Sequence, residues 1–110
     1  MTDASYPREH RSFPRWRNPT ITLSVGARTF RTVDWSLGGV LVGDVGDGAW
    51  KCGQMVDVRV GVSATALRDD RMIVVRYDAD QKRLAIRARP QGTVLDAVRR
   101  DCEAAGLAPA

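Results

Sequence analysis

The chain is poor in the residues on which most enzyme and metal sites depend. It contains one histidine, His10, and two cysteines, Cys52 and Cys102. One histidine near the N-terminus does not complete a convincing catalytic triad or dyad, and the two cysteines are too far apart for the spacing of zinc ligands. We therefore expect no enzymatic activity, no metal and no cofactor, and we interpret both cysteines as reduced structural thiols.

Long hydrophobic runs are also absent. No stretch approaches the ~18–20 apolar residues that a helix needs to span a bilayer. The opening MTDASYPREHR has no apolar core of the kind found in signal peptides. These absences predict a cytoplasmic protein without a membrane partner, and a content of 44% hydrophobic and 27% charged residues fits one globular domain.

Lysine is nearly missing from a chain whose formal net charge is +4, because Lys51 and Lys82 are its only lysines. Arginine supplies the rest of the positive charge. Its planar, forked guanidinium suits phosphate groups and the edges of guanine. The composition therefore favours an anionic partner without identifying it.

Alternation of apolar and polar residues predicts short strands separated by turn-forming sequence. Behind Pro90 and Gly92, Thr93 is expected to cap a helix whose apolar stripe contains Val98 and Cys102. Six strands followed by one helix predict a mainly β fold, a small antiparallel barrel. The expected strands are 20–25, 29–35, 40–42, 55–60, 72–77 and 84–89.

Three other patterns are interpreted as structural. The acidic pairs Asp69-Asp70 and Asp78/Asp80 are expected to be solvated turn residues. The glycine-rich stretch 43–48 lacks the GxxxxGK[ST] pattern and is not followed by a helix, so it is predicted to be a flexible connector.

The stretch VDWSLGGV places an acid and a large aromatic residue at a predicted turn between two strands. Asp34, Ser36 and Gly39 form a DxSxxG pattern there, and Arg11 and Arg15 form RxxxR about twenty residues earlier. The arginine spacing alone has little value, because RLAIR repeats it near the C-terminus. We expect the arginines of that second match, at 83 and 87, to be solvated on the last strand, away from any ligand.

In type, order and spacing, HRSFPRWR followed by TVDWSLGGV resembles the PilZ domain family, the bacterial receptors for cyclic di-GMP. The resemblance extends over essentially the whole chain and implies a six-stranded antiparallel barrel with a helix near the C-terminus. It implies a switch segment, residues 1–19, that carries RxxxR and precedes the barrel and helix of residues 20–110. One departure is Ala88, where the last strand of the family often has phenylalanine.

Carried over by position, the resemblance makes Arg11, Arg15, Asp34, Ser36 and Gly39 the residues that bind cyclic di-GMP. Arginine can donate to guanine O6 and N7, pair with phosphate or stack on the base. The opposite guanine edge presents N1–H and N2–H₂, for which Asp34 is an acceptor. Ser36 can bind the ligand while shaping its own turn, and Gly39 allows a positive φ or a close approach of the ligand.

The residues beside the two motifs are candidates for further contacts. Trp35 is expected to pack in the core or at its rim rather than against a base, because strand alternation directs it away from Asp34. Trp16 could stack on a guanine or pin the switch segment to the barrel. The segment 6–19 is expected to be mobile without ligand and to close over it. The full set of additional candidates is Arg8, His10, Trp16, Arg17, Trp35 and Gly38.

Three functions remain open at this point. The first is a single-domain receptor that binds cyclic di-GMP and relays it to an effector protein in motility, biofilm or exopolysaccharide control. The second is a small basic barrel that binds single-stranded nucleic acid, against which the aromatic content is only 6%. The third is a PilZ-like interaction module that does not bind nucleotide. The intact motifs favour the first function, with no nucleic acid as partner.

Overall fold

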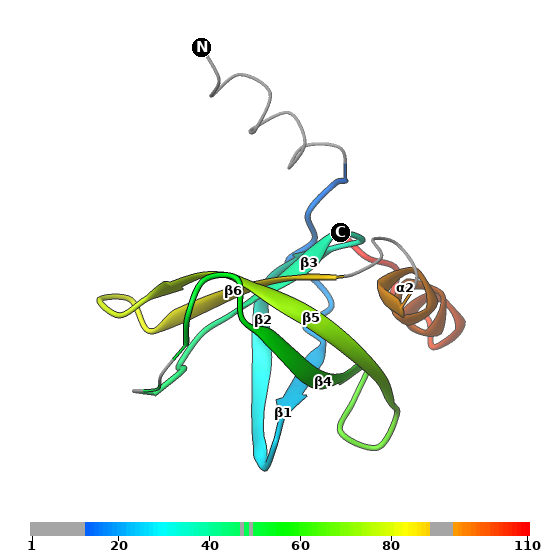
Figure 1. Cartoon of the computed structure of the whole chain (residues 1–110). Coiled ribbons are helices and arrows are strands. Elements are labelled where there is room, and N and C mark those ends of the chain that lie inside the picture. The colour runs from blue at the N-terminus through cyan, green and yellow to red at the C-terminus, as the bar shows by residue number, and fades with distance from the viewer. Residues whose placement is uncertain (1–12, 47, 49, 89–93) are drawn as a thin grey trace.

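A computed structural model describes residues 13–46, 48, 50–88 and 94–110, and within these residues six strands form one closed barrel (Figure 1). The strand order around the barrel is β1-β2-β3-β6-β5-β4, and every neighbouring pair is antiparallel. The elements are β1 (Thr22–Val25), β2 (Arg28–Ser36), β3 (Gly39–Val42), β4 (Met55–Gly61), β5 (Leu67–Asp78), β6 (Arg83–Ala88) and α2 (Val94–Ala104). The predicted fold class is confirmed.

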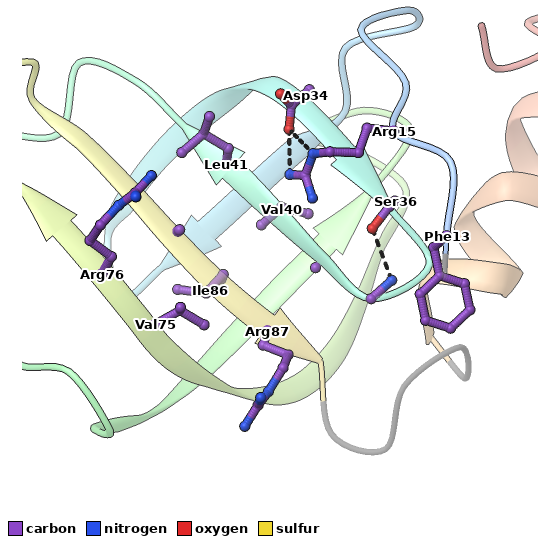
Figure 2. A pocket seen from close by; sticks show the side chains of 13 residues that line it. Phe13, Arg15, Asp34, Ser36, Val40, Leu41, Val75, Arg76, Ile86 and Arg87 are labelled. Carbon is purple, nitrogen blue, oxygen red and sulfur yellow. Dashed lines mark hydrogen bonds and ion pairs between the residues drawn. The ribbon is translucent and has the colours of Figure 1, made fainter. Parts of the chain in front are cut away.

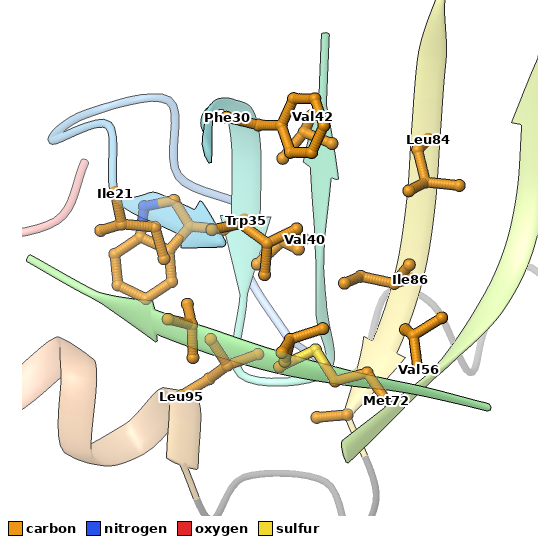
Figure 3. Close-up of a cluster of buried hydrophobic side chains, with 14 of the residues drawn as sticks. Ile21, Phe30, Trp35, Val40, Val42, Val56, Met72, Leu84, Ile86 and Leu95 are labelled. Carbon is orange, nitrogen blue, oxygen red and sulfur yellow. The ribbon is translucent and has the colours of Figure 1, made fainter. Parts of the chain in front are cut away.

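The interior of the barrel is filled by the apolar members of each alternating strand (Figure 3). Leu23, Val40, Met72 and Ile86 come from four different strands, and each is at most 2% exposed. Trp35 is the largest fully buried side chain and lies among them, so its predicted place in the core is confirmed. This alternation leaves the charged residues of the same strands on the outer side of the barrel, whereas Thr22, Thr32 and Ser36 are buried.

The helix α2 packs beside β4 and presents Leu95, Val98 and Cys102 to the core (Figure 1). Its outer contact is a two-pronged ion pair in which Arg68 Nε and Nη2 donate to the two carboxylate oxygens of Asp101, at 2.9 and 3.0 Å. The hydrogen bonds from this guanidinium lower the pKa of Asp101 below its ordinary value. The helix is thus attached by apolar packing and by a charged contact at its edge.

The strand β5 is longer than the sequence indicated, because it begins at Leu67 rather than at residue 72. The prediction that Asp69 and Asp70 are turn residues is therefore wrong. Both lie in β5, where Asp69 pairs across the sheet with Arg59 at 3.5 Å, and Asp57 of β4 accepts from Arg71 at 2.8 Å. Opposite charges that face one another across two paired strands stabilise the pairing. They allow a polar segment, which its composition alone would assign to a loop, to form a strand.

The other acidic pair does form a turn. Asp78 ends β5, and its Oδ1 accepts the backbone N–H groups of Asp80 and Gln81 at 3.0 and 3.1 Å. Cys52 and Cys102 are both free thiols. The expected cap Thr93 lies outside the described residues. No helix within the described part of the chain is long and apolar enough to cross a membrane.

Truncation of the helix anchor should destabilise the domain strongly. Leu95→Ala removes a fully buried side chain, so we expect it to lower the free energy of unfolding by about 2–5 kcal/mol. Leu107→Ala is the matched control, because Leu107 is 45% exposed and its loss should change stability by less than about 1 kcal/mol. Denaturant unfolding of both variants measures the difference, and equal stabilities would show that α2 does not complete the core.

Candidate functional site

The outer surface of four adjacent strands presents two rows of residues that run across the sheet. In the first row Asp34 of β2 faces Leu41 of β3, which faces Ala85 of β6, which faces Arg76 of β5. Trp35 points into the core between Asp34 and Ser36, so these two side chains lie on the outer side of the sheet, where Asp34 is partly exposed and Ser36 is only 3% exposed. The first row therefore runs from an acidic end to a basic end over a small apolar floor.

The second row lies two residues further along the same strands. Ser36 of β2 faces Gly39 of β3, which in turn faces Arg87 of β6. Leu37 and Gly38 form the tight turn between β2 and β3. Ser36 Oγ accepts the backbone N–H of Gly38 at 3.1 Å, and the Gly38 carbonyl accepts the N–H of Ala88 at 2.9 Å. The hydroxyl of Ser36 thus shapes its own turn, and the turn is tied to the end of β6.

Glycine is required at position 39 for a reason other than a positive φ. It is not among the described glycines with positive φ, whereas a Cβ at this position would overlap the backbone carbonyl oxygen of Ile86 in β6. The positive φ suggested by the sequence is therefore wrong at Gly39, and the close approach is made by a neighbouring strand. Gly39 allows β3 and β6 to pair beneath the site.

Arg15 and Asp34, one from each sequence motif, are in direct contact. Arg15 Nε donates to Asp34 Oδ1 at 2.9 Å, and Arg15 Nη2 donates to the same oxygen. Asp34 Oδ2 has no hydrogen-bond partner among the described residues, and the side chains are 44% and 21% exposed. The pair therefore keeps one carboxylate oxygen and part of a guanidinium available at the surface.

Trp16 holds this arginine against the barrel. Its backbone N–H donates to the Trp35 carbonyl at 2.7 Å, and its carbonyl accepts the Trp35 N–H at 3.0 Å. The two indole rings meet edge to face with centroids 4.8 Å apart. Of the two roles considered for Trp16, the structure has it pinning the segment to the barrel.

The neighbouring residues of the N-terminal segment are attached as well. The indole N–H of Trp35 donates to the Pro19 carbonyl at 2.9 Å. The backbone N–H groups of Arg17 and Asn18 both donate to the Ala110 carbonyl, at 3.0 and 3.1 Å. The sequence led us to expect that this segment packs against the barrel only when ligand is bound. In the structure, residues 16–19 already form hydrogen bonds with β2 and with Ala110.

A pocket of about 490 Å³ opens over the two rows (Figure 2). Phe13, Arg15, Asp34 and Ser36 line one side of it, and Gly38 admits the Phe13 ring, to which a Cβ would be only 3.1 Å away. Figure 2 shows Arg15 directed toward Asp34, with Arg76 on the far side of Leu41. The remaining lining residues are Gly38, Gly39, Val40, Leu41, Val75, Arg76, Ala85, Ile86 and Arg87.

The position of Arg87 corrects the sequence interpretation. We expected it to lie away from the ligand motifs, but it pairs across the sheet with Gly39 and lines the same pocket as Arg15. Arg83, its partner in the second RxxxR match, is not among the lining residues. The error arose because the sequence does not reveal that β6 pairs with β3.

Arg76 was missed for a different reason. The register of β5 against β6 shifts between Val74 and Arg76, so Val75 is an extra residue at a bulge. Strict alternation from the buried Met72 and Val74 would turn residue 76 inward, and the bulge instead places Arg76 opposite Ala85 on the outer face. Nothing in the sequence predicted this shift in the register of β5 against β6.

Of the other candidate residues, some lie outside the described part of the chain and some lie away from the pocket. Arg8, His10 and Arg11 lie outside the described residues. Arg17 is exposed next to Trp16 and does not line the pocket, and Trp35 lies beneath it in the core. Within the described ranges no group of three or more histidine, cysteine or acidic residues could hold a metal ion.

Comparison with known proteins bears on the fold. No family model matches the sequence, and no curated protein matches it either. Among solved structures, the chain is similar to the Bacillus subtilis inhibitor of motility, MotI/DgrA, with a TM-score of 0.61 and 12% sequence identity. The match covers 87% of this chain but 50% of that one, so this chain corresponds to half of its structural neighbour. At this identity the likeness concerns the fold alone.

Gly39→Ala should destabilise the barrel under the site. The added methyl would overlap the Ile86 carbonyl, so β3 and β6 must separate locally, at a cost of about 1–3 kcal/mol in unfolding free energy. Gly43→Ala is the control, because its Cβ would be 3.4 Å from Val33 Cγ2, an ordinary contact. Chemical denaturation distinguishes them, and a Gly39→Ala protein as stable as Gly43→Ala would contradict the close approach.

Proposed function

We propose that this chain is a PilZ-type receptor that binds cyclic di-GMP in the pocket over β2, β3, β6 and β5, without catalysing a reaction. The observation that supports this most directly is the contact between Arg15 and Asp34 at the edge of that pocket. Two motifs nineteen residues apart, each weak by itself, supply groups that touch each other and share one cavity with Ser36 and Gly39.

The exposed chemistry suits a guanine base. Asp34 Oδ2, which no described residue contacts by a hydrogen bond, can accept from N1–H or N2–H₂ of the base, while Arg15 has N–H groups for a phosphate or for O6 and N7. The shared Oδ1 holds both side chains in position before ligand arrives, which reduces the entropy lost on binding. Arg11 is proposed to add a further cation from the segment outside the described residues.

The alternative of single-stranded nucleic acid binding lacks a row of exposed aromatic rings in the described part of the chain, where Phe13 is the one aromatic residue that lines the pocket. Trp35 is fully buried, and Trp16 and Trp50 pack against the core. Nonspecific single-strand binders use exposed aromatic rings along a basic groove. The arrangement therefore favours a small cyclic dinucleotide over a polymer.

The proposed output is a protein contact made in the cytoplasm when the ligand is bound. The structural neighbour is by name an inhibitor of motility, and motility is accordingly one of the processes, with biofilm and exopolysaccharide control, in which we propose an effector for this chain. With no catalytic group assigned, the signal would be a change in the surface around the pocket.

Isothermal titration calorimetry tests the proposal directly. We expect cyclic di-GMP to bind, with an affinity that falls as salt rises, because arginine–phosphate contacts are screened. GTP and a short single-stranded RNA are the controls. Binding of the RNA without binding of cyclic di-GMP would reject the receptor function, and the same titration gives the number of ligand molecules per chain.

Arg15→Ala should weaken binding of cyclic di-GMP by about 1–3 kcal/mol, the value of a bidentate guanine contact, or roughly 5- to 150-fold. Asp34→Ala should also weaken it, because the base loses its acceptor. Both proteins should remain folded, since an exposed ion pair contributes little to stability. Arg83→Ala is the matched control on the barrel surface. If Asp34→Ala unfolds the protein, the carboxylate serves the turn and not the ligand.

A further inference from the structure

We infer that Arg76 and Arg87 form a second anion-binding wall of this pocket and bind a phosphate of the ligand at the end opposite Asp34. The inference rests on the proposed function, because the phosphate is one of the two in cyclic di-GMP. It adds to the sequence motifs two arginines from β5 and β6 that neither motif contains. They would determine how tightly the far half of the ligand is held.

The charges that line the pocket do not balance. Arg15, Arg76 and Arg87 face a single acid, Asp34, which leaves an excess of two positive charges. Because Arg15 and Asp34 already pair, the excess belongs to the β5–β6 side. A ligand with two phosphates has the complementary charge.

Six of the ten other described arginines have an acidic partner, and among the described arginines that have none only Arg76 and Arg87 line this pocket. The six are Arg15, Arg59, Arg68, Arg71, Arg99 and Arg100. Arg76 and Arg87 are exposed and form no ion pair with a described residue, although they lie in regular strands. A guanidinium left unpaired in a strand beside a pocket is available to an outside anion.

The strand pairing determines the Cα positions of these two arginines relative to Asp34. Arg76 lies in the same cross-strand row as Asp34, and three strand spacings separate the two residues, which is about 14 Å along the sheet. The residues between them are Leu41 and Ala85, and their apolar side chains form the floor of the pocket without a charged group. A dinucleotide can therefore lie across the floor with different groups at the two ends.

Arg87 approaches from the neighbouring row. It is two residues beyond Ala85 on the same face of β6, and Ala85 is the cross-strand partner of Arg76 next to the bulge at Val75. In Figure 2 the Arg76 side chain extends toward Leu41, whereas Arg87 points away from Asp34. Both side chains are exposed, and Arg87 can rotate over the floor when an anion is present.

The experiment is calorimetry of cyclic di-GMP with Arg76→Ala, Arg87→Ala and the double variant. We expect each single change to weaken binding roughly 10- to 150-fold, as for other charged hydrogen bonds, and the double variant to show a shallower salt dependence. Arg83→Ala, an exposed arginine of β6 that does not line the pocket, should bind like the wild type. Equal thermal midpoints of all variants confirm that each is folded.

Arg76→Lys and Arg87→Lys test the phosphate assignment. Lysine binds phosphate as a point charge but cannot form the planar fork that reads a guanine edge, so the lysine variants should retain most of the affinity. Lysine variants as weak as the alanine ones would overturn the assignment to phosphate.

The outcomes separate this inference from the proposed function. If the wild type binds and Asp34→Ala does not, while the Arg76 and Arg87 variants bind within twofold of the wild type, the second wall is wrong and the receptor function stands. If the wild type binds no cyclic di-GMP, the proposed function fails, and the inference fails with it.

Discussion

The anchoring of Trp35 in the barrel is the constraint on which the geometry of the site depends. Its side chain fills the core, its backbone pairs with Trp16, and its indole N–H bonds to the Pro19 carbonyl. Because side chains alternate along a strand, a tryptophan fixed inward forces both of its neighbours, Asp34 and Ser36, outward. A slip of one residue would bury the acid and expose the indole, at a large cost in free energy. This explains why a large aromatic residue stands inside a turn motif of small and polar residues.

The same residue positions the first motif relative to the second. Arg15 precedes Trp16, and the two backbone hydrogen bonds between Trp16 and Trp35 set the distance at which Arg15 can reach Asp34. The ion pair is therefore a consequence of pairing between the N-terminal segment and β2, and no strong attraction between the charges is needed to form it. Edge-to-face packing of the two indoles adds to this attachment.

How much of this could be predicted from the sequence depends on how local each feature is. Leu23 and Ile86 are buried, as the alternation within their own strands predicted. Arg76 and Arg87 could not be placed, since their position depends on the pairing of β6 with β3 and on a bulge at Val75. Asp69 was misplaced because two adjacent aspartates are typical of a turn, whereas here Asp69 lies in β5 opposite Arg59 of β4. The pocket residues that belong to a local motif were named from the sequence, and those whose position depends on strand order were not.

Stability and ligand chemistry are assigned to opposite faces of the same strands. Inward residues such as Leu84 and Val74 are fully buried and contribute packing, whereas Arg76 and Arg87 on the outer face contribute almost nothing to folding because they are exposed and form no ion pair with a described residue. An outward arginine without a partner therefore has no folding interaction to lose when it turns toward an anion. The exposed pair of Arg15 and Asp34 is similarly weak, so a ligand can share or replace its hydrogen bonds at small cost to the fold. Under the proposed function, the charged side chains of the pocket would therefore rearrange around the ligand while the packed core of the barrel stays unchanged.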